Sequence, residues 1–102
     1  MPLSTNNWFV YIILTRGQRL YTGITNDLER RWQTHLDGKG AKFFRTDPPA
    51  KIIYLETDYD RASATAREIA IKQLRRADKL RLIQQQNPRL AALDITAVKS
   101  SP

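Results

Sequence analysis

The residues of this chain best suited to chemistry are two tyrosines in neighbouring apolar segments. Tyr11 lies in residues 8–14 and Tyr21 in residues 20–25, and both segments are rich in β-branched and aromatic side chains. As antiparallel strands, the segments would pair Tyr11 with Gly23 and would place Tyr21 diagonal to Tyr11 on the same face. Three further groups follow in the chain: Arg31, His35 and Glu68. Together these groups suggest a small metal-dependent nuclease site built on a hairpin.

A helix directly after this hairpin would have to bring the arginine and the histidine to the tyrosines. Asn26, followed three residues later by Glu29, resembles a capping box that would begin the helix, and Gly38 would end it. The apolar residues at helical spacing are Leu28, Trp32 and Leu36. Arg31 and His35 are four residues apart and therefore share one face, where they flank this apolar stripe.

The middle of the chain predicts a loop and a short third strand. Residues 39–45 are basic and contain two phenylalanines, a composition that favours a mobile loop. The Asp-Pro-Pro sequence at residues 47–49 excludes a continuous helix. We therefore expect the third strand over residues 51–56.

A second helical region should follow this strand. Asp58 or Asp60 could cap it, and its expected apolar residues are Ala62, Ala66, Ile69 and Ala70. We expect a bend or break over residues 75–78, then a further helical stretch that ends at residues 87–88, an Asn-Pro sequence.

The resulting order β-β-α-β-α-α predicts a small α+β domain of three strands, the first two of them antiparallel, with helices packed on the sheet. A chain of 102 residues suits one such domain, which we assign to residues 7–86. Residues 87–102 lack a sustained hydrophobic period and predict a frayed or loosely docked tail. The apolar residues of this tail are Leu90, Leu93, Ile95 and Val98.

The charge of the chain favours a polyanionic partner. Lys and Arg number 17 against 10 Asp and Glu, which leaves a formal net charge of +7, and the pI is about 10.1. DNA is the first candidate, because cations that neutralise phosphates release counterions. Phe43 or Phe44 could stack on a base. The expected phosphate contacts are Lys39, Lys42, Arg45, Lys72, Arg75, Arg76 and Lys79.

Several other classes are excluded or disfavoured. The absence of Cys removes disulfides, a thiolate nucleophile and zinc sites of the Cys type. The apolar run over residues 8–14 is too short to span a membrane, and the N-terminus lacks an export signal. We expect a cytoplasmic protein that needs no small-molecule cofactor, and nothing in the sequence specifies an oligomeric state.

Four groups of residues carry a resemblance to a known family. They are Val10-Tyr11-Ile12, then Tyr21-Thr22-Gly23, then residues 26–31 with His35, and Glu68 with Ile71-Lys72. In this order and spacing they resemble the GIY-YIG nuclease superfamily, and the compact, single-domain YhbQ-like (UPF0213) members in particular. The resemblance covers roughly residues 7–84. It implies a three-stranded antiparallel sheet flanked by helices, a divalent metal bound through one glutamate, and hydrolysis of DNA phosphodiesters.

The resemblance also implies a role for each matching residue. Tyr11 would be the general base toward water. Because a free phenol has a pKa of about 10, nearby positive charge must lower this pKa or a partner must take the proton. Tyr21 would position the nucleophile, Arg31 would stabilise charge on the phosphoryl group, and His35 would hydrogen-bond within the site. Glu68 would bind Mg²⁺ or Mn²⁺, together with waters and substrate phosphate.

Simpler explanations exist for the same residues. Tyrosines in half-buried strands usually pack, and Glu68 with Lys72 is a common i,i+4 ion pair. His35 alone would more often be a half-exposed helix residue, and the basic residues could merely solubilise the surface.

Two alternatives to the nuclease therefore stay open. Several family nucleases carry an Asn about a dozen residues after the metal-binding glutamate, where this chain has Leu80. We expect a metal-dependent DNA endonuclease of DNA repair or recombination, and the first alternative is a non-catalytic nucleic-acid-binding module with the same fold. The second alternative is an interaction subunit that docks on a repair or recombination protein.

Overall fold

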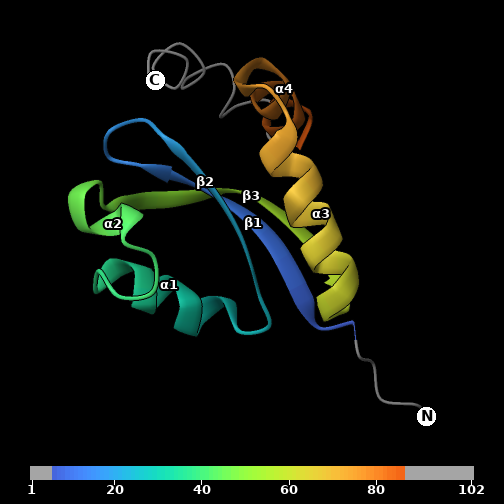
Figure 1. The fold of residues 1–102 in the computed structure, drawn as a ribbon, viewed down its shortest axis with the longest axis horizontal. Helices are drawn as coiled ribbons and strands as arrows, with labels where there is room; N and C mark the ends of the chain where they lie inside the picture. Colours follow the sequence, from blue (N-terminus) through green and yellow to red (C-terminus); the bar gives the residue numbers. More distant parts are fainter. Residues whose placement is uncertain (1–5, 87–102) are drawn as a thin grey trace.

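The computed structural model describes residues 6–86, which form a three-stranded antiparallel sheet with the strand order β2-β1-β3. The helices α1 and α2 lie on one side of the sheet, whereas α3 crosses the other side and leads into α4 (Figure 1). The predicted α+β fold is confirmed, with one additional short helix, α2. The elements are β1 (Trp8–Thr15), β2 (Leu20–Thr25), α1 (Leu28–Leu36), α2 (Phe43–Thr46), β3 (Pro49–Tyr59), α3 (Arg61–Gln73) and α4 (Arg76–Gln86).

The hairpin has the predicted register. Tyr11 pairs with Gly23, and Ile13 pairs with Tyr21. Because side chains alternate along a strand, Tyr11, Ile13 and Tyr21 lie on the same face of the sheet, where they belong to one apolar cluster. β1 is the central strand and is covered on both faces, so every residue from Val10 to Thr15 is buried.

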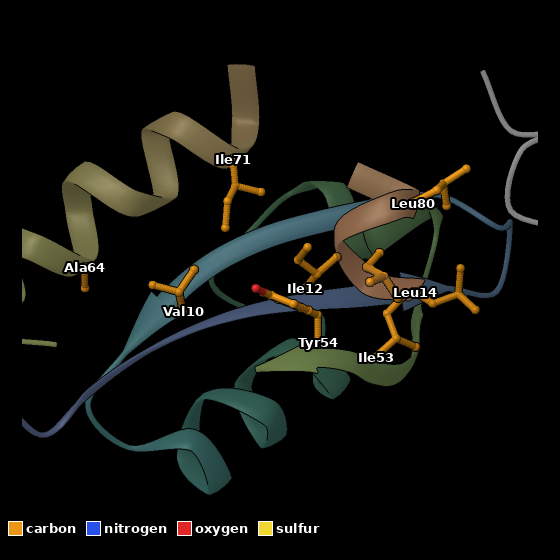
Figure 2. Packing of buried hydrophobic residues seen from close by; sticks show 9 residues of the cluster. Val10, Ile12, Leu14, Ile53, Tyr54, Ala64, Ile71 and Leu80 are labelled. Carbon is orange, nitrogen blue, oxygen red and sulfur yellow. The ribbon is translucent and has the colours of Figure 1, made fainter. Parts of the chain in front are cut away.

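The two faces of the sheet carry separate cores. Val10, Ile12 and Leu14 of β1 pack with Ala64 and Ile71 of α3 and with apolar residues of β3 and α4. Figure 2 shows Ala64 and Ile71 directed from α3 toward the sheet. On the opposite face, Tyr11, Ile13 and Phe44 form the second core, with partly buried residues of α1 around them. The residues facing α3 are mainly aliphatic, whereas those facing α1 and α2 are rich in aromatic rings.

Helix α1 differs from its prediction in its cap and its buried face. Asp27, and not Asn26, is the N-cap: its side chain accepts a hydrogen bond from the backbone nitrogen of Arg30 at 3.2 Å. Leu36 is 47% exposed, whereas His35 is only 2% exposed. The face toward the sheet runs through residues 28, 32 and 35, one turn apart, so Leu36 is rotated toward solvent. The helix ends near Gly38, as predicted.

The segment predicted to be a mobile basic loop contains helix α2, and its Phe44 is 2% exposed. The hydrophobic contacts of Phe44 under the sheet account for this order, and local composition alone could not reveal them. β3 is also longer than the predicted residues 51–56. It begins at Pro49, where a proline is tolerated because the first residue of a strand can dispense with its N–H.

Helix α3 begins at Arg61 and is capped by Asp60, which forms a capping box with Ser63, so Asp60 and not Asp58 is the cap. A break between the helices is present as predicted, but it lies at residues 74–75 and not over 75–78, because α4 already begins at Arg76. The predicted apolar face was wrong. Ala64 and Ile71 are fully buried, whereas Ile69 is 50% exposed, and Ala62, Ala66 and Ala70 are exposed as well.

The error has a physical cause, because the buried face of α3 contains two charged residues. Residues 64, 67, 68 and 71 share this face, and Arg67 and Glu68 are only partly exposed. Arg67 binds Glu56 of β3 in an ion pair of 2.9 Å, which compensates for its desolvation. The expected tail, residues 87–102 with Leu90, Leu93, Ile95 and Val98, lies outside the described residues. No helix among residues 6–86 is long and apolar enough to cross a membrane.

Candidate active site

The phenol of Tyr11 lies across the neighbouring strand at Gly23. A Cβ atom on Gly23 would be 2.5 Å from the Tyr11 hydroxyl oxygen and 2.7 Å from the ring carbon that bears it. No side chain fits there without displacing the phenol, so glycine is required by this close approach. β2 is an edge strand of the sheet, and the hydroxyl of Tyr11 is thereby placed at that edge.

The hydroxyl of Tyr11 hydrogen-bonds to Nε2 of His35 at 2.8 Å. Burial and the nearby Arg31 charge lower the pKa of His35 to about 4, so the imidazole is neutral at physiological pH. In the tautomer with its hydrogen on Nδ1, Nε2 accepts the phenol hydrogen. Nδ1 has no hydrogen-bond partner among the described residues. A neutral imidazole is thus placed to accept the proton of Tyr11. The half-exposed histidine that we considered as the simpler explanation is not observed.

Tyr21 and Phe44 hold this pair in an aromatic cluster. The ring centroid of Tyr21 lies 6.5 Å from that of Tyr11 and 5.4 Å from that of His35. Phe44 packs against both Tyr21, at 4.7 Å, and His35, at 4.5 Å. The buried position of Phe44 excludes base stacking by this residue and gives it a supporting role, whereas the same prediction for Phe43, which is partly exposed, stays open. The only signal of Phe44 in the sequence is its aromatic side chain.

Arg31 and Glu68 reach the same place from different helices. The charge of Arg31 lowers the pKa of both Tyr11 and His35, and Glu68 raises that of Tyr11, so both charges lie within electrostatic range of the phenol. Helix α3 packs on the opposite face of the sheet and also contacts β2. Tyr11, Tyr21 and His35 pack together, whereas Arg31 and Glu68 lie within electrostatic range of the phenol.

The electrostatics of Tyr11 distinguish between the two ways of making it a base. Burial raises the pKa of Tyr11, the neighbouring Tyr21 raises it further, and the opposing effect of Arg31 is smaller. The phenol is therefore protonated at neutral pH. The charge of Arg31 lowers the pKa less than burial and Tyr21 raise it, which favours the other route, in which the hydrogen-bond partner His35 takes the proton.

Glu68 is the only carboxylate among the five residues and the predicted metal ligand. Its side chain is 19% exposed and forms an ion pair with Lys72 at 3.2 Å. Residues 6–86 contain no group of three or more His, Cys, Asp or Glu that could hold a metal ion. A single carboxylate fits Mg²⁺, which commonly takes one or two protein carboxylates and completes its shell with waters and phosphate oxygens. It does not fit structural zinc, which takes four protein ligands.

The predicted phosphate-contacting residues occupy two areas. The first area is on the α3–α4 side. It contains Lys72, which pairs with Glu68, and also Arg76 and Lys79, which line one pocket. Arg75 is exposed between the helices. Lys39, Lys42 and Arg45 are exposed around α2.

The loop that carries Lys39 passes over the candidate site. A Cβ on Gly40 would lie 3.7 Å from a guanidinium nitrogen of Arg31 and 4.0 Å from Nδ1 of His35. Gly40 adopts a φ of +88°, which favours glycine. The loop backbone thereby packs against both residues.

One functional candidate was missed by the sequence analysis. Arg19 at the end of the hairpin lies over the ring of Phe43, with its guanidinium carbon 4.6 Å from the ring centroid. Its Nε donates to Asp47 at 2.8 Å, and Asp47 also accepts hydrogen bonds from Thr15 and Gly17. Against the opposing effect of desolvation, these hydrogen bonds hold the pKa of Asp47 below its usual value. No local motif predicted this long-range pairing.

The family to which the chain is similar agrees with this arrangement of side chains. The GIY-YIG catalytic domain family matches residues 7–81, most of the chain. The chain belongs to the GIY-YIG family. Membership implies a nuclease-type function, and the resemblance inferred from the two tyrosine motifs, Arg31 and Glu68 is confirmed.

The similar proteins place this GIY-YIG domain among the UPF0213 proteins. It is 48% identical to UPF0213 protein XAC3202 of Xanthomonas axonopodis pv. citri over 78% of each chain. It is 43% identical to UPF0213 protein YhbQ of Escherichia coli K12 over 74% of this chain and 76% of that one. The NMR structure of UPF0213 protein BH0048 from Bacillus halodurans aligns with a TM-score of 0.54 and 28% identity, over 93% of this chain and 98% of the other.

Proposed function

We propose that this GIY-YIG domain is a metal-dependent endonuclease that hydrolyses DNA phosphodiester bonds in DNA repair or recombination in the cytoplasm. The observation that carries the proposal is the hydrogen bond between the buried Tyr11 phenol and the neutral His35 imidazole. Tyr21 packs beside this bond, and the charges of Arg31 and Glu68 lie within electrostatic range of the phenol.

The hydrogen bond supplies a path for the proton of the attacking water. As the water oxygen bonds to phosphorus, its proton passes to the oxygen of Tyr11 while the phenol proton passes to Nε2 of His35. The phenol is neutral before and after the transfer, whereas His35, whose pKa is lowered to about 4, holds the proton only transiently and passes it on to solvent. The bond from phosphorus to the leaving oxygen breaks, and that oxygen takes a proton from solvent.

The remaining residues act on charge and position. The guanidinium of Arg31 is exposed at the site and can pair with the phosphoryl oxygens as negative charge develops on them. Tyr21 would position the water beside Tyr11. Mg²⁺ or Mn²⁺, when bound through Glu68, supplies positive charge to the phosphate and the leaving oxygen.

Cleavage of supercoiled plasmid, branched DNA and single-stranded DNA tests the proposal. We expect nicking with Mg²⁺ or Mn²⁺, none with chelator, and loss of nicking in Tyr11→Phe and Glu68→Ala. Tyr54→Phe is the matched control for the phenol, because Tyr54 is equally buried but packs in the cluster beneath α3. If folded Tyr11→Phe and Glu68→Ala cut as fast as the parent, the assigned chemistry is wrong.

A non-catalytic nucleic-acid-binding module is the second candidate, and two observations favour it. Glu68 is already paired with Lys72. Leu80, at the position where several family nucleases carry an Asn, is buried with Ile83 in the apolar core and can donate no hydrogen bond. This candidate predicts salt-sensitive binding that needs no metal and leaves DNA intact in the same assay.

A further inference from the structure

A basic pocket opens beside the candidate active site, at the tip of the hairpin. Its volume is about 330 Å³, and its lining comes from β2 and its turn, from α2 and from α4. The lining residues are Arg19, Leu20, Phe43, Arg76 and Lys79. Three cations from two distant segments of the chain therefore meet around one cavity.

The cations of this pocket differ in their partners. Asp47 pairs with Arg19, and Arg76 donates to the backbone oxygen of Gln18 at 2.8 Å, which joins α4 to the hairpin turn. Within residues 6–86, no carboxylate lies within ion-pair distance of Lys79. Burial lowers the pKa of Lys79, and the charges of Arg76 and Lys72 lower it further. Such a gathering of like charges in a half-buried place is costly unless an anion relieves it.

The pocket adjoins the candidate site on two sides. On one side, the Phe43 ring lies 5.7 Å from the Tyr21 ring, centroid to centroid. On the other side, Lys79 is within electrostatic range of Lys72, which pairs with Glu68. A ligand in the pocket would therefore be next to the place where the scissile phosphate is proposed to bind.

We infer that this pocket binds one flanking nucleotide of the DNA strand, with its phosphate on Lys79 and Arg76 and its sugar or base against Phe43 and Leu20. The inference rests on the proposed function for the position of the scissile phosphate. A volume of about 330 Å³ is at the lower end of ligand pockets and suits a single nucleotide better than a duplex. Anchoring the neighbouring nucleotide would hold the strand in register over Tyr11.

Binding of a fluorescein-labelled single-stranded oligonucleotide in EDTA, followed by fluorescence anisotropy, tests the pocket without requiring cleavage. The variant is Lys79→Gln, and the matched control is Arg81→Gln, which removes the same charge from the same helix. Arg81 lies outside the pocket, is 68% exposed and pairs with Asp78. Circular dichroism and thermal melting confirm that each variant is folded.

We expect Lys79→Gln to weaken oligonucleotide binding at least fivefold. We also expect the slope of log K against log salt to become shallower by about 0.7, the value for one lost phosphate contact on a single strand. Arg81→Gln should change affinity less than twofold. Equal effects of the two variants would overturn the inference, because only general charge would then matter. Since cleavage is not measured, failure here is distinct from failure of the nuclease.

Direct titration of small anions shows whether the ligand of the pocket is a DNA strand or a free phosphate compound. Deoxyadenosine monophosphate and inorganic phosphate are titrated into the parent and Lys79→Gln by isothermal calorimetry. The inference requires the oligonucleotide to bind far more tightly than either small anion. If deoxyadenosine monophosphate binds as tightly as the oligonucleotide and loses affinity in Lys79→Gln, the pocket is a free-nucleotide site and the assignment to a strand is wrong.

Discussion

The two faces of the central strand β1 differ in the kind of core that they build. Val10, Ile12 and Leu14 face α3 in an aliphatic core, whereas Tyr11 faces α1 in a cluster of aromatic rings around a buried histidine. The first face has mainly groups that can only pack. The second combines packing with a phenol and an imidazole that are joined by a hydrogen bond. One strand thus supplies stability on one side and chemistry on the other.

Tyr54 and Tyr11 show this difference between the two faces in their hydrogen-bond partners. Tyr54 donates to Glu56, whose carboxylate is also bound by Arg67 and Tyr59. Burial and the Glu56 carboxylate raise the pKa of Tyr54 to about 12. Glu56 is itself ionised in this network, because hydrogen bonds from Arg67 and the tyrosines lower its pKa against the effect of burial. Tyr54 is a fixed structural donor, whereas the partner of Tyr11 is neutral and able to accept a proton.

The largest expected effect is on the rate of DNA cleavage, which should differ between variants of these two tyrosines. Tyr11→Phe should lower the rate of metal-dependent DNA cleavage about 10² to 10⁴-fold, the range for loss of general base catalysis. Tyr54→Phe should leave the rate within about twofold and cost about 1 kcal/mol of stability through its lost hydrogen bond. Single-turnover nicking and urea unfolding measure the two effects. The contrast fails if Tyr54→Phe slows cleavage as much as Tyr11→Phe.

The aliphatic core should respond to truncation in stability. Ile71→Ala, at a fully buried position of α3, should reduce the free energy of unfolding by about 2–5 kcal/mol. Ile69→Ala, two residues away and 50% exposed, should change it by less than about 0.5 kcal/mol. Urea denaturation measures both. Similar losses in the two variants would contradict the observed helix face.

The chemical face should make stability depend on pH. His35 has a pKa of about 4 in the folded state, below its value of about 6.5 in an unfolded chain. The unfolded chain therefore binds the extra proton first, and stability should fall as pH drops from about 6.5 to 4, by about 3 kcal/mol.

Because the chain contains 1 His, the variant His35→Gln isolates this effect. Its unfolding free energy should be nearly flat over the same window, as measured by urea denaturation at a series of pH values. Asp47, Glu56 and Asp60 have lowered pKa values, so their contributions are lost at more acid pH. A parent whose stability does not change between pH 6.5 and 4.5 would contradict a buried, neutral His35.

The smallest expected effect concerns the close contact that places the phenol. Gly23→Ala would put a Cβ 2.5 Å from the Tyr11 hydroxyl oxygen, so the ring must shift, at a cost of about 1–3 kcal/mol. We expect the double variant Gly23→Ala/Tyr11→Phe to recover part of this stability, because the hydroxyl is gone. Thermal melting of the single and double variants measures the coupling, and purely additive effects would show that the two residues do not interact.

Local rules predicted much of the fold and of the candidate site. The alternation of side chains in residues 8–14 and 20–25 correctly placed Tyr11 opposite Gly23, because register depends on a period of two. The same rules failed where charged residues lie on a buried face. Arg67 and Glu68 mark the sheet-facing side of α3, but a search for apolar residues selected Ile69 instead.

The sequence by itself determined the identities of the chemical groups, their order and the elements that carry them. Only the tertiary structure decided that His35 is buried and neutral against Tyr11, that Glu68 lies within electrostatic range of the phenol, and that Phe44 supports the site from α2. Strand alternation and helix periodicity act between near neighbours, so they can be derived locally. Burial, pKa and convergence depend on how distant elements pack, because desolvation and charge act through space and not along the chain.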